Sequence, residues 1–105
     1  MSEPWEDIAK RLAAHPRFEW REGMMATDHV GNVPDLTDAA TTGILLLGML
    51  DEALGGVSGE YGASLGRGLG AESHLWDASI GGESNMHEVP GAACALALLE
   101  AWGTP

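Results

Sequence analysis

The chain has 105 residues, of which 45% are hydrophobic, and it carries a formal net charge of −11. This length provides for one domain with one core, so we expect residues 1–105 to form a single domain. The hydrophobic content excludes an intrinsically disordered chain. The negative charge argues against direct binding of nucleic acid, because the surface would repel a polyanion.

The charge is unevenly distributed along the chain. Residues 1–21 contain as many basic as acidic side chains, whereas residues 22–105 hold Arg67 as their one Lys or Arg and carry the whole charge of −11. Such a surface can serve solubility alone. It can also attract a basic partner, such as a basic host protein or nucleoprotein complex.

The termini and the apolar runs bear on where the protein works. Residues 1–7 are acidic and lack the apolar core of a secretory signal. The apolar runs at 44–50 and 92–99 fall short of the ~20 residues that a membrane span needs. A single cysteine, Cys94, excludes an internal disulfide, and its apolar neighbours predict a buried thiol rather than a catalytic one. We therefore expect a cytoplasmic protein.

The first segment is predicted to form a helix with Pro4 in its first turn, because Trp5, Ile8 and Leu12 recur at helical spacing. Ser2 or Glu3 would cap its start. Pro16 would end it at His15, since the residue before a proline avoids the α conformation.

The next segment alternates between apolar and charged residues. Residues 17–21 therefore predict a half-buried strand, with Phe18 and Trp20 on one face. A turn at Glu22-Gly23 would lead into a second strand over residues 24–30. The two strands would form a hairpin.

A long apolar helix is predicted from Asp38 to Leu54, capped by Asp38 and ended by Gly55-Gly56. Because this helix is apolar nearly all round, we expect it to lie in the middle of the fold. Leu47 and Leu50 would then be buried.

The rest of the chain predicts a sheet followed by a helix. The glycine-rich stretch 55–70 can hold one strand, and residues 74–80 and 84–89 would pair as a hairpin across Gly81-Gly82. Pro90 would open a final helix over residues 90–102.

Strands and helices are grouped rather than strictly alternating, which favours an α+β fold with an antiparallel sheet. The predicted fold is a small antiparallel sheet of four to five strands packed with three helices, in the order α-β-β-α-β-β-(β)-α.

Two glycine motifs resemble sites of chemistry. Residues 62–66 fit GxSxG, but Arg67 to Gly70 would not continue as the helix that a nucleophile elbow requires, so we predict no catalytic serine at Ser64. Residues 66–71 fit GxGxxA, again without a following helical period. We assign no catalytic residue and no cofactor.

The chain also has polar pairs that include histidine. His74 with Asp77, His87 with Glu88, and Asp28 with His29 make a divalent-metal cluster conceivable, but none of these spacings is diagnostic. We therefore assign no metal ligand.

Two segments of the chain resemble parts of other proteins. Residues 12–24 (LAAHPRFEWREGM) and 33–43 (VPDLTDAATTG) resemble parts of small uncharacterised proteins of bacteriophages, prophages and other mobile elements, and the closing run 96–101 is similar in character. The resemblance covers about half of the chain and is weakest in the glycine-rich middle. It implies no catalytic residues.

This resemblance implies a phage-encoded accessory protein in a bacterial host. The leading hypothesis is a non-enzymatic inhibitor that docks on a host defence complex such as CRISPR–Cas, in the manner of an anti-CRISPR protein. The first alternative is a virion or assembly component that works through homo-oligomer contacts, with a homodimer as one form. A small metal-binding protein or enzyme is the second. The predicted partner contacts are Glu60, Glu72, Asp77, Glu83 and Glu88.

Overall fold

The structure is a computed structural model that describes residues 3–27, 31–55, 62–81 and 83–103. Its elements are three helices, three strands and one short 3-10 helix. In chain order they are α1 (Trp5–Ala14), α2 (Ala39–Leu54), β1 (Ala63–Arg67), η1 (Gly70–Glu72), β2 (Trp76–Ile80), β3 (Glu83–His87) and α3 (Pro90–Trp102).

Helix α1 forms in the predicted segment and ends as predicted, with His15 as its C-cap directly before Pro16, but it begins at Trp5, after Pro4. Its buried face consists of Ile8, Ala9 and Leu12. The predicted cap at its start is wrong for Glu3, because Pro4 occupies the N-cap position and no side chain bonds to the first turn. Ser2 lies outside the described residues.

Helix α2 also begins and ends as predicted. The Asp38 carboxylate accepts a hydrogen bond from the Thr41 amide, and Gly55 is the C-cap. Its buried face is formed by Thr41, Leu45, Met49 and Ala53.

The predicted central position of α2 is wrong. Leu47 is 56% exposed and Leu50 is 39% exposed, so the face opposite the buried one is open to solvent. Apolar residues on every side predicted a helix enclosed by the fold, but only one side of α2 has a partner within the described chain.

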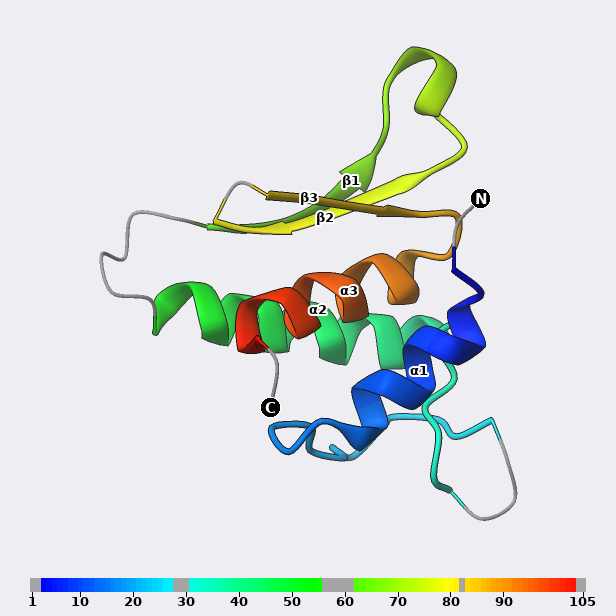
Figure 1. The fold of residues 1–105 in the computed structure, drawn as a ribbon, viewed down its shortest axis with the longest axis vertical. Helices are drawn as coiled ribbons and strands as arrows, with labels where there is room; N and C mark the ends of the chain where they lie inside the picture. The colour runs from blue at the N-terminus through cyan, green and yellow to red at the C-terminus, as the bar shows by residue number, and fades with distance from the viewer. Residues whose placement is uncertain (1–2, 28–30, 56–61, 82, 104–105) are drawn as a thin grey trace.

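Helix α3 is the central element instead. It packs against α1, α2, β2 and β3, and Figure 1 shows it between the sheet and α1. Its buried residues are mostly small: Gly91, Ala92, Ala93, Cys94, Ala95, Ala97 and Leu98. Small side chains let several elements approach one helix at once, which suits a helix that is surrounded on several sides.

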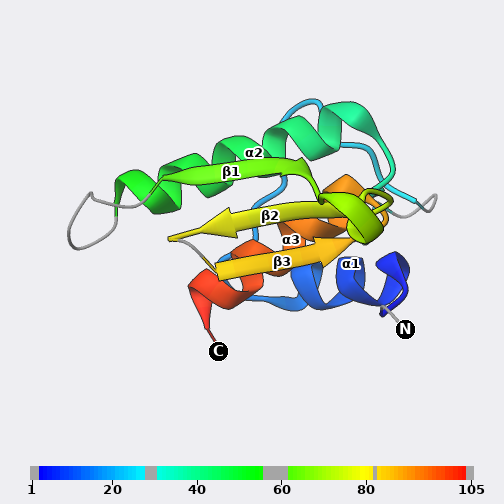
Figure 2. The same cartoon turned by 90° about the horizontal axis from the view of Figure 1, so that it is seen from above.

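The strands form one antiparallel sheet in the order β1-β2-β3. In its register Trp76 stands between Arg67 and His87, and Ala78, which is buried, stands between Leu65 and Asn85. One face of the sheet lies over α2 and α3, as Figures 1 and 2 show, and no described element covers the other face. Gly81 makes the turn from β2 to β3 with a φ of +77°, a conformation that favours glycine.

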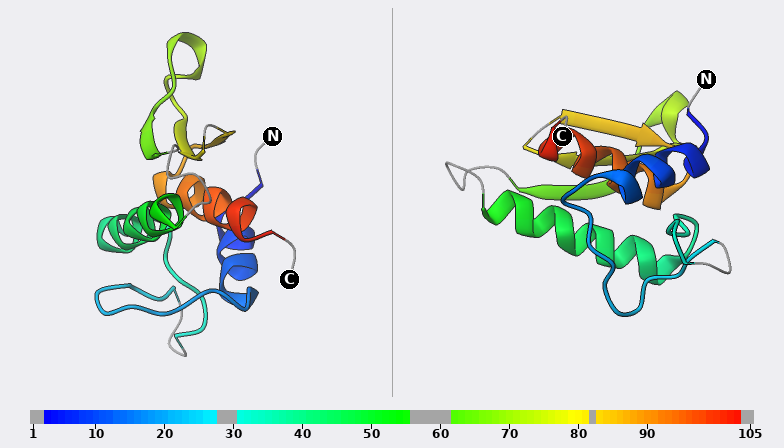
Figure 3. Two further views of the ribbon diagram at one scale, coloured as in Figure 1. Left: turned by 90° about the vertical axis from the view of Figure 1, so that its left-hand side faces the viewer. Right: turned by 60° about the horizontal axis from the view of Figure 1, so that its bottom comes forward.

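The predicted hairpin between the first two helices does not form in the described chain. Residues 17–23 run as a loop, and Ala26 and Pro34 make only an isolated antiparallel bridge. Figure 3 shows this segment on the side of the helices away from the sheet, where no strand is available to pair with it. The fold is therefore α+β with three helices and a three-stranded antiparallel sheet, in the order α-α-β-β-β-α, rather than with four to five strands.

No helix in the described part of the chain has the length and apolar character that a membrane crossing requires.

Candidate functional site

A groove with acidic walls lies where the start of α1 meets the turn between β3 and α3. Its volume is about 310 Å³. We call it the acidic groove, and its lining residues are Glu3, Pro4, Trp5, Glu6, His87, Glu88 and Val89.

His87 joins the two sides of the acidic groove. Its ring is buried, and Nδ1 accepts a hydrogen bond from the Val89 amide at 3.0 Å. Because Nδ1 is the acceptor, the proton of the neutral ring is on Nε2, which donates to the Glu3 carbonyl oxygen at 2.6 Å. The segment before α1 is thereby fixed to the end of β3.

The charge of the acidic groove is entirely negative, apart from any charge on His87. Three carboxylates line it, and none of the described residues that line it is Lys or Arg. Glu3 has a partner outside the lining, since Arg11 donates to it at 2.7 Å, whereas Glu6 and Glu88 are exposed. Trp5 packs against the core and supplies an aromatic wall. Carboxylates beside an aromatic ring suit a cationic side chain such as Lys or Arg.

Of the five predicted contact residues, Glu88 lies in the acidic groove. Glu72 is exposed in η1. Asp77 lies on β2, where one carboxylate oxygen accepts from the Ser84 hydroxyl at 3.2 Å and the other is buried without a hydrogen-bond partner. Glu83 begins β3. Glu60 lies outside the described residues.

The structure does not bring these residues together in one patch. Glu83 pairs with Ile80 at one end of the β2–β3 hairpin, and Glu88 follows the other end of β3. Five residues of strand separate them by about 17 Å.

Sequence reasoning missed Glu3 and Glu6, because residues 1–21 sum to zero charge. The signal was present within α1, where acids occupy the first turn and Arg11 lies in the last. The two signs are therefore separated along the helix.

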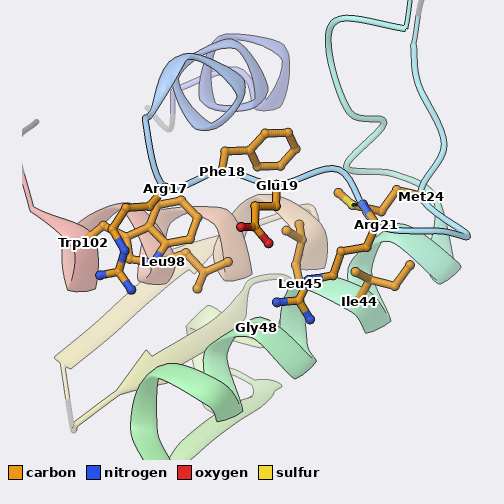
Figure 4. Close-up of a pocket in the computed structure, with 10 residues that line it drawn as sticks. All are labelled: Arg17, Phe18, Glu19, Arg21, Met24, Ile44, Leu45, Gly48, Leu98 and Trp102. Carbon is orange, nitrogen blue, oxygen red and sulfur yellow. Dashed lines mark hydrogen bonds between the residues drawn. The ribbon is translucent and has the colours of Figure 1, made fainter. Parts of the chain in front are cut away.

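A second cavity lies between the loop 17–24 and helices α2 and α3 (Figure 4). It is small, about 50 Å³, and its walls are mainly apolar, including Phe18, Ile44 and Leu98. Two arginines flank it, and Figure 4 shows Arg17 beside Trp102.

Both arginines at this second cavity are compensated by acids of α2. Arg17 Nη2 lies 2.6 Å from a Glu52 carboxylate oxygen, which also accepts from the Trp102 indole at 3.0 Å. Arg21 lies 3.5 Å from Asp51. The small volume and the balanced charge favour a packing defect with a surface ion-pair network over a ligand site.

The motifs considered for catalysis lie in ordinary structural positions. Ser64 is the second residue of β1, with its hydroxyl 2.9 Å from the Ser79 hydroxyl, and does not lie at a strand-to-helix turn. The GxGxxA segment leads into η1, which has three residues. Cys94 is buried as predicted, and its burial raises the pKa of the thiol to about 12.

Two of the histidines have structural roles. His15 is buried, as His87 is. Its Nδ1 accepts a hydrogen bond from the Arg17 amide, and its Nε2 lies 2.9 Å from the Gly103 carbonyl oxygen. Within the described residues, no group of three or more His, Cys, Asp or Glu side chains is placed to hold a metal ion. His29 lies outside these residues.

Comparison with known proteins gives no further guide: no protein family, no curated protein and no solved structure matches the chain.

Proposed function

We propose that the protein acts by binding a basic protein partner, and that the acidic groove receives a cationic side chain of that partner. The observation that carries the proposal is the groove itself. It combines three carboxylates with an aromatic wall in a cavity of about 310 Å³.

The charge of the whole chain supports the same proposal. A surface with a net charge of −11 steers a basic partner toward it and raises the association rate. Glu72 and Glu88 are exposed, and both lie at the end of the sheet where η1 connects β1 to β2. Their carboxylates add to this field.

The specific form that we propose is a phage-encoded inhibitor of a host defence complex such as CRISPR–Cas. This form rests on the resemblance of residues 12–24 and 33–43 to phage and prophage proteins. Such complexes hold nucleic acid in basic grooves, which an acidic protein can occupy by electrostatic complementarity.

The first alternative is a virion or assembly component that works through contacts between copies. The exposed apolar face of α2 favours it, because a role in assembly needs a self-associating surface.

The proposal is tested by equilibrium binding to a panel of purified CRISPR–Cas effector complexes. Glu6→Lys with Glu88→Lys reverses two exposed charges of the acidic groove and leaves the Glu3–Arg11 pair intact. The matched control, Glu19→Lys with Glu22→Lys, makes the same change in total charge in the exposed loop after α1.

We expect the groove variant to weaken binding at least tenfold and the control to weaken it much less. Equal losses would show that total charge, and not the groove, drives binding. Absence of binding to every complex by the wild type would contradict the proposed target.

A further inference from the structure

Helix α2 exposes an apolar stripe opposite its buried face. The stripe has the alternating spacing of three and four residues that one face of a helix requires, and its members are Ala40, Gly43, Leu47, Leu50 and Leu54. Leu47, Leu50 and Leu54 are 56%, 39% and 81% exposed. We propose that two copies of the chain associate through this stripe, with their α2 helices antiparallel and a two-fold axis at Leu47. This proposal does not depend on the proposed function.

The sizes of the side chains favour a second copy as the occupant. The side chains of the stripe are small at the N-terminal end of α2 and large at its C-terminal end. In an antiparallel pair centred on Leu47, Leu54 of one copy lies over Ala40 of the other, and Leu50 lies within one residue, about 1.5 Å along the helix, of Gly43. Leu50 and Leu54 thus each meet a small residue, and Leu47 meets its own copy at the axis, so the stripe is complementary to itself, as an interface with two-fold symmetry requires.

Gly43 is an independent sign of close approach. Glycine is less favourable than every residue except proline inside a helix. Within one chain, a Cβ at Gly43 would meet no atom of residues 3–27, 31–55, 62–81 and 83–103 within 4 Å, so packing among these residues does not require glycine there. A partner helix that approaches closely does require it, because the missing side chain makes room for Leu50 of the partner.

The charges favour the antiparallel arrangement. Residues 39–50 contain no charged side chain, so this face is free of the repulsion that a net charge of −11 creates elsewhere. Asp51 and Glu52 lie in the last turn of α2. Parallel helices would place these acids against each other, whereas antiparallel helices place them toward the partner's N-terminal end, where the helix dipole favours negative charge.

The area buried between the two helices determines how tightly the dimer is expected to associate. A helix of 16 residues is about 24 Å long. A contact strip of that length and roughly 10 Å wide buries about a third of the ~800 Å² per partner of a standard interface. The loop beside α2, whose Gly23 lies against Ile44, carries the exposed Trp20 and Met25 and can add apolar area. We expect a weak dimer, with a Kd on the order of 10 µM.

Cross-linking tests the register. In a Cys94→Ala background, single cysteines replace Ala40, Leu47 or Leu54, and a short bis-maleimide links thiols across the interface. In the proposed dimer Leu47→Cys links to itself, and a mixture of Ala40→Cys with Leu54→Cys links efficiently. Leu54→Cys alone does not, because the two copies of residue 54 are about 21 Å apart along the pair of helices. Leu69→Cys, at a position that is 89% exposed and away from α2, is the control.

Sedimentation at 1–200 µM tests the dimer without cross-linking. We expect the mass to rise from 11.0 kDa toward twice that value. Leu47→Glu, which places two like charges at the axis, should raise the Kd at least tenfold, as should Gly43→Leu, which fills the space for Leu50. Leu69→Glu should leave the Kd unchanged. Circular dichroism verifies that each variant is folded.

Three results would overturn the proposal. The first is a monomer at 200 µM. The second is efficient linking of Leu54→Cys to itself, which indicates parallel helices. The third is a dimer whose Kd is the same in the wild type, Leu47→Glu and Gly43→Leu, which places the contact elsewhere, for instance on the open face of the sheet.

Discussion

At the scale of single residues, two histidines anchor the ends of the described chain. His87 bonds to Glu3 near the N-terminus and His15 bonds to Gly103 near the C-terminus, each through a ring whose second nitrogen accepts from the backbone. Residue type alone suggested metal binding as one use of His87. Its actual role depends on a contact across 84 positions of sequence, which local patterns do not contain.

We predict that His87→Leu lowers the free energy of unfolding by about 1–3 kcal/mol, because the Val89 amide and the Glu3 carbonyl lose their partner at a buried site. Urea denaturation measures the loss. His74→Leu is the control, since His74 is exposed and a surface change there should stay within about 0.5 kcal/mol. Equal stability of His87→Leu and the wild type would contradict the anchoring role.

Cys94 yields a prediction about alkaline pH. Burial raises the pKa of its thiol to about 12 in the folded chain, whereas the unfolded chain has the ordinary value of about 8.5. The unfolded state therefore loses its proton first. This contribution to stability is complete below about pH 8.5 and declines as the pH rises toward 12.

The corresponding variant is Cys94→Ala. Between pH 9 and 11 the free energy of unfolding of the wild type should fall more steeply than that of the variant, by up to about 1.4 kcal/mol per pH unit. Denaturant titrations at a series of pH values measure both slopes. Parallel slopes would show that the thiol ionises equally in both states.

At the scale of elements, the local signals were sufficient for the three helices. Asp38 and Gly55 cap the two ends of α2, Pro16 ends α1, and Pro90 begins α3. The strand predicted at residues 17–21 failed for a non-local reason. Alternation indicates a half-buried segment, but a strand also needs a neighbour with free backbone groups, and this loop lies away from the sheet.

The position of α2 was wrong for a related reason. An apolar surface on every side predicts contact on every side, and it does not distinguish the core of one chain from an interface between two. Hydrophobic pattern alone therefore could not place Leu47 and Leu50.

The two faces of α2 should respond differently to charge. Met49→Asp buries an unpaired carboxylate at a fully buried position and should cost several kcal/mol or prevent folding. Leu47→Asp should cost less than about 1 kcal/mol in the monomer, since its site is 56% exposed. Thermal melts at low micromolar concentration compare the two variants. A larger loss for Leu47→Asp would contradict the observed orientation of the helix.

At the scale of the whole molecule, the sequence predicted the sign of the surface charge but not its arrangement. Glu83 and Glu88 are five residues apart in sequence and lie at opposite ends of one strand. Glu3 and Glu6 are distant in sequence from Glu88 and share one groove with it. Which acids cooperate is decided by the register of the sheet and by the docking of α1, and neither can be predicted from composition.

We propose that the acidic surface of the protein binds a basic partner. We would measure its association rate with a CRISPR–Cas effector complex at low and high salt, for the wild type and for a variant in which the exposed residues Glu6, Glu72 and Glu88 are changed to Lys. We predict that the wild-type rate falls at least tenfold between about 50 and 500 mM salt, where the Debye length shortens from roughly 14 to 4 Å, and that the variant associates slowly at both. An association rate that is unaffected by salt and by these charge reversals would contradict electrostatic binding of a basic partner.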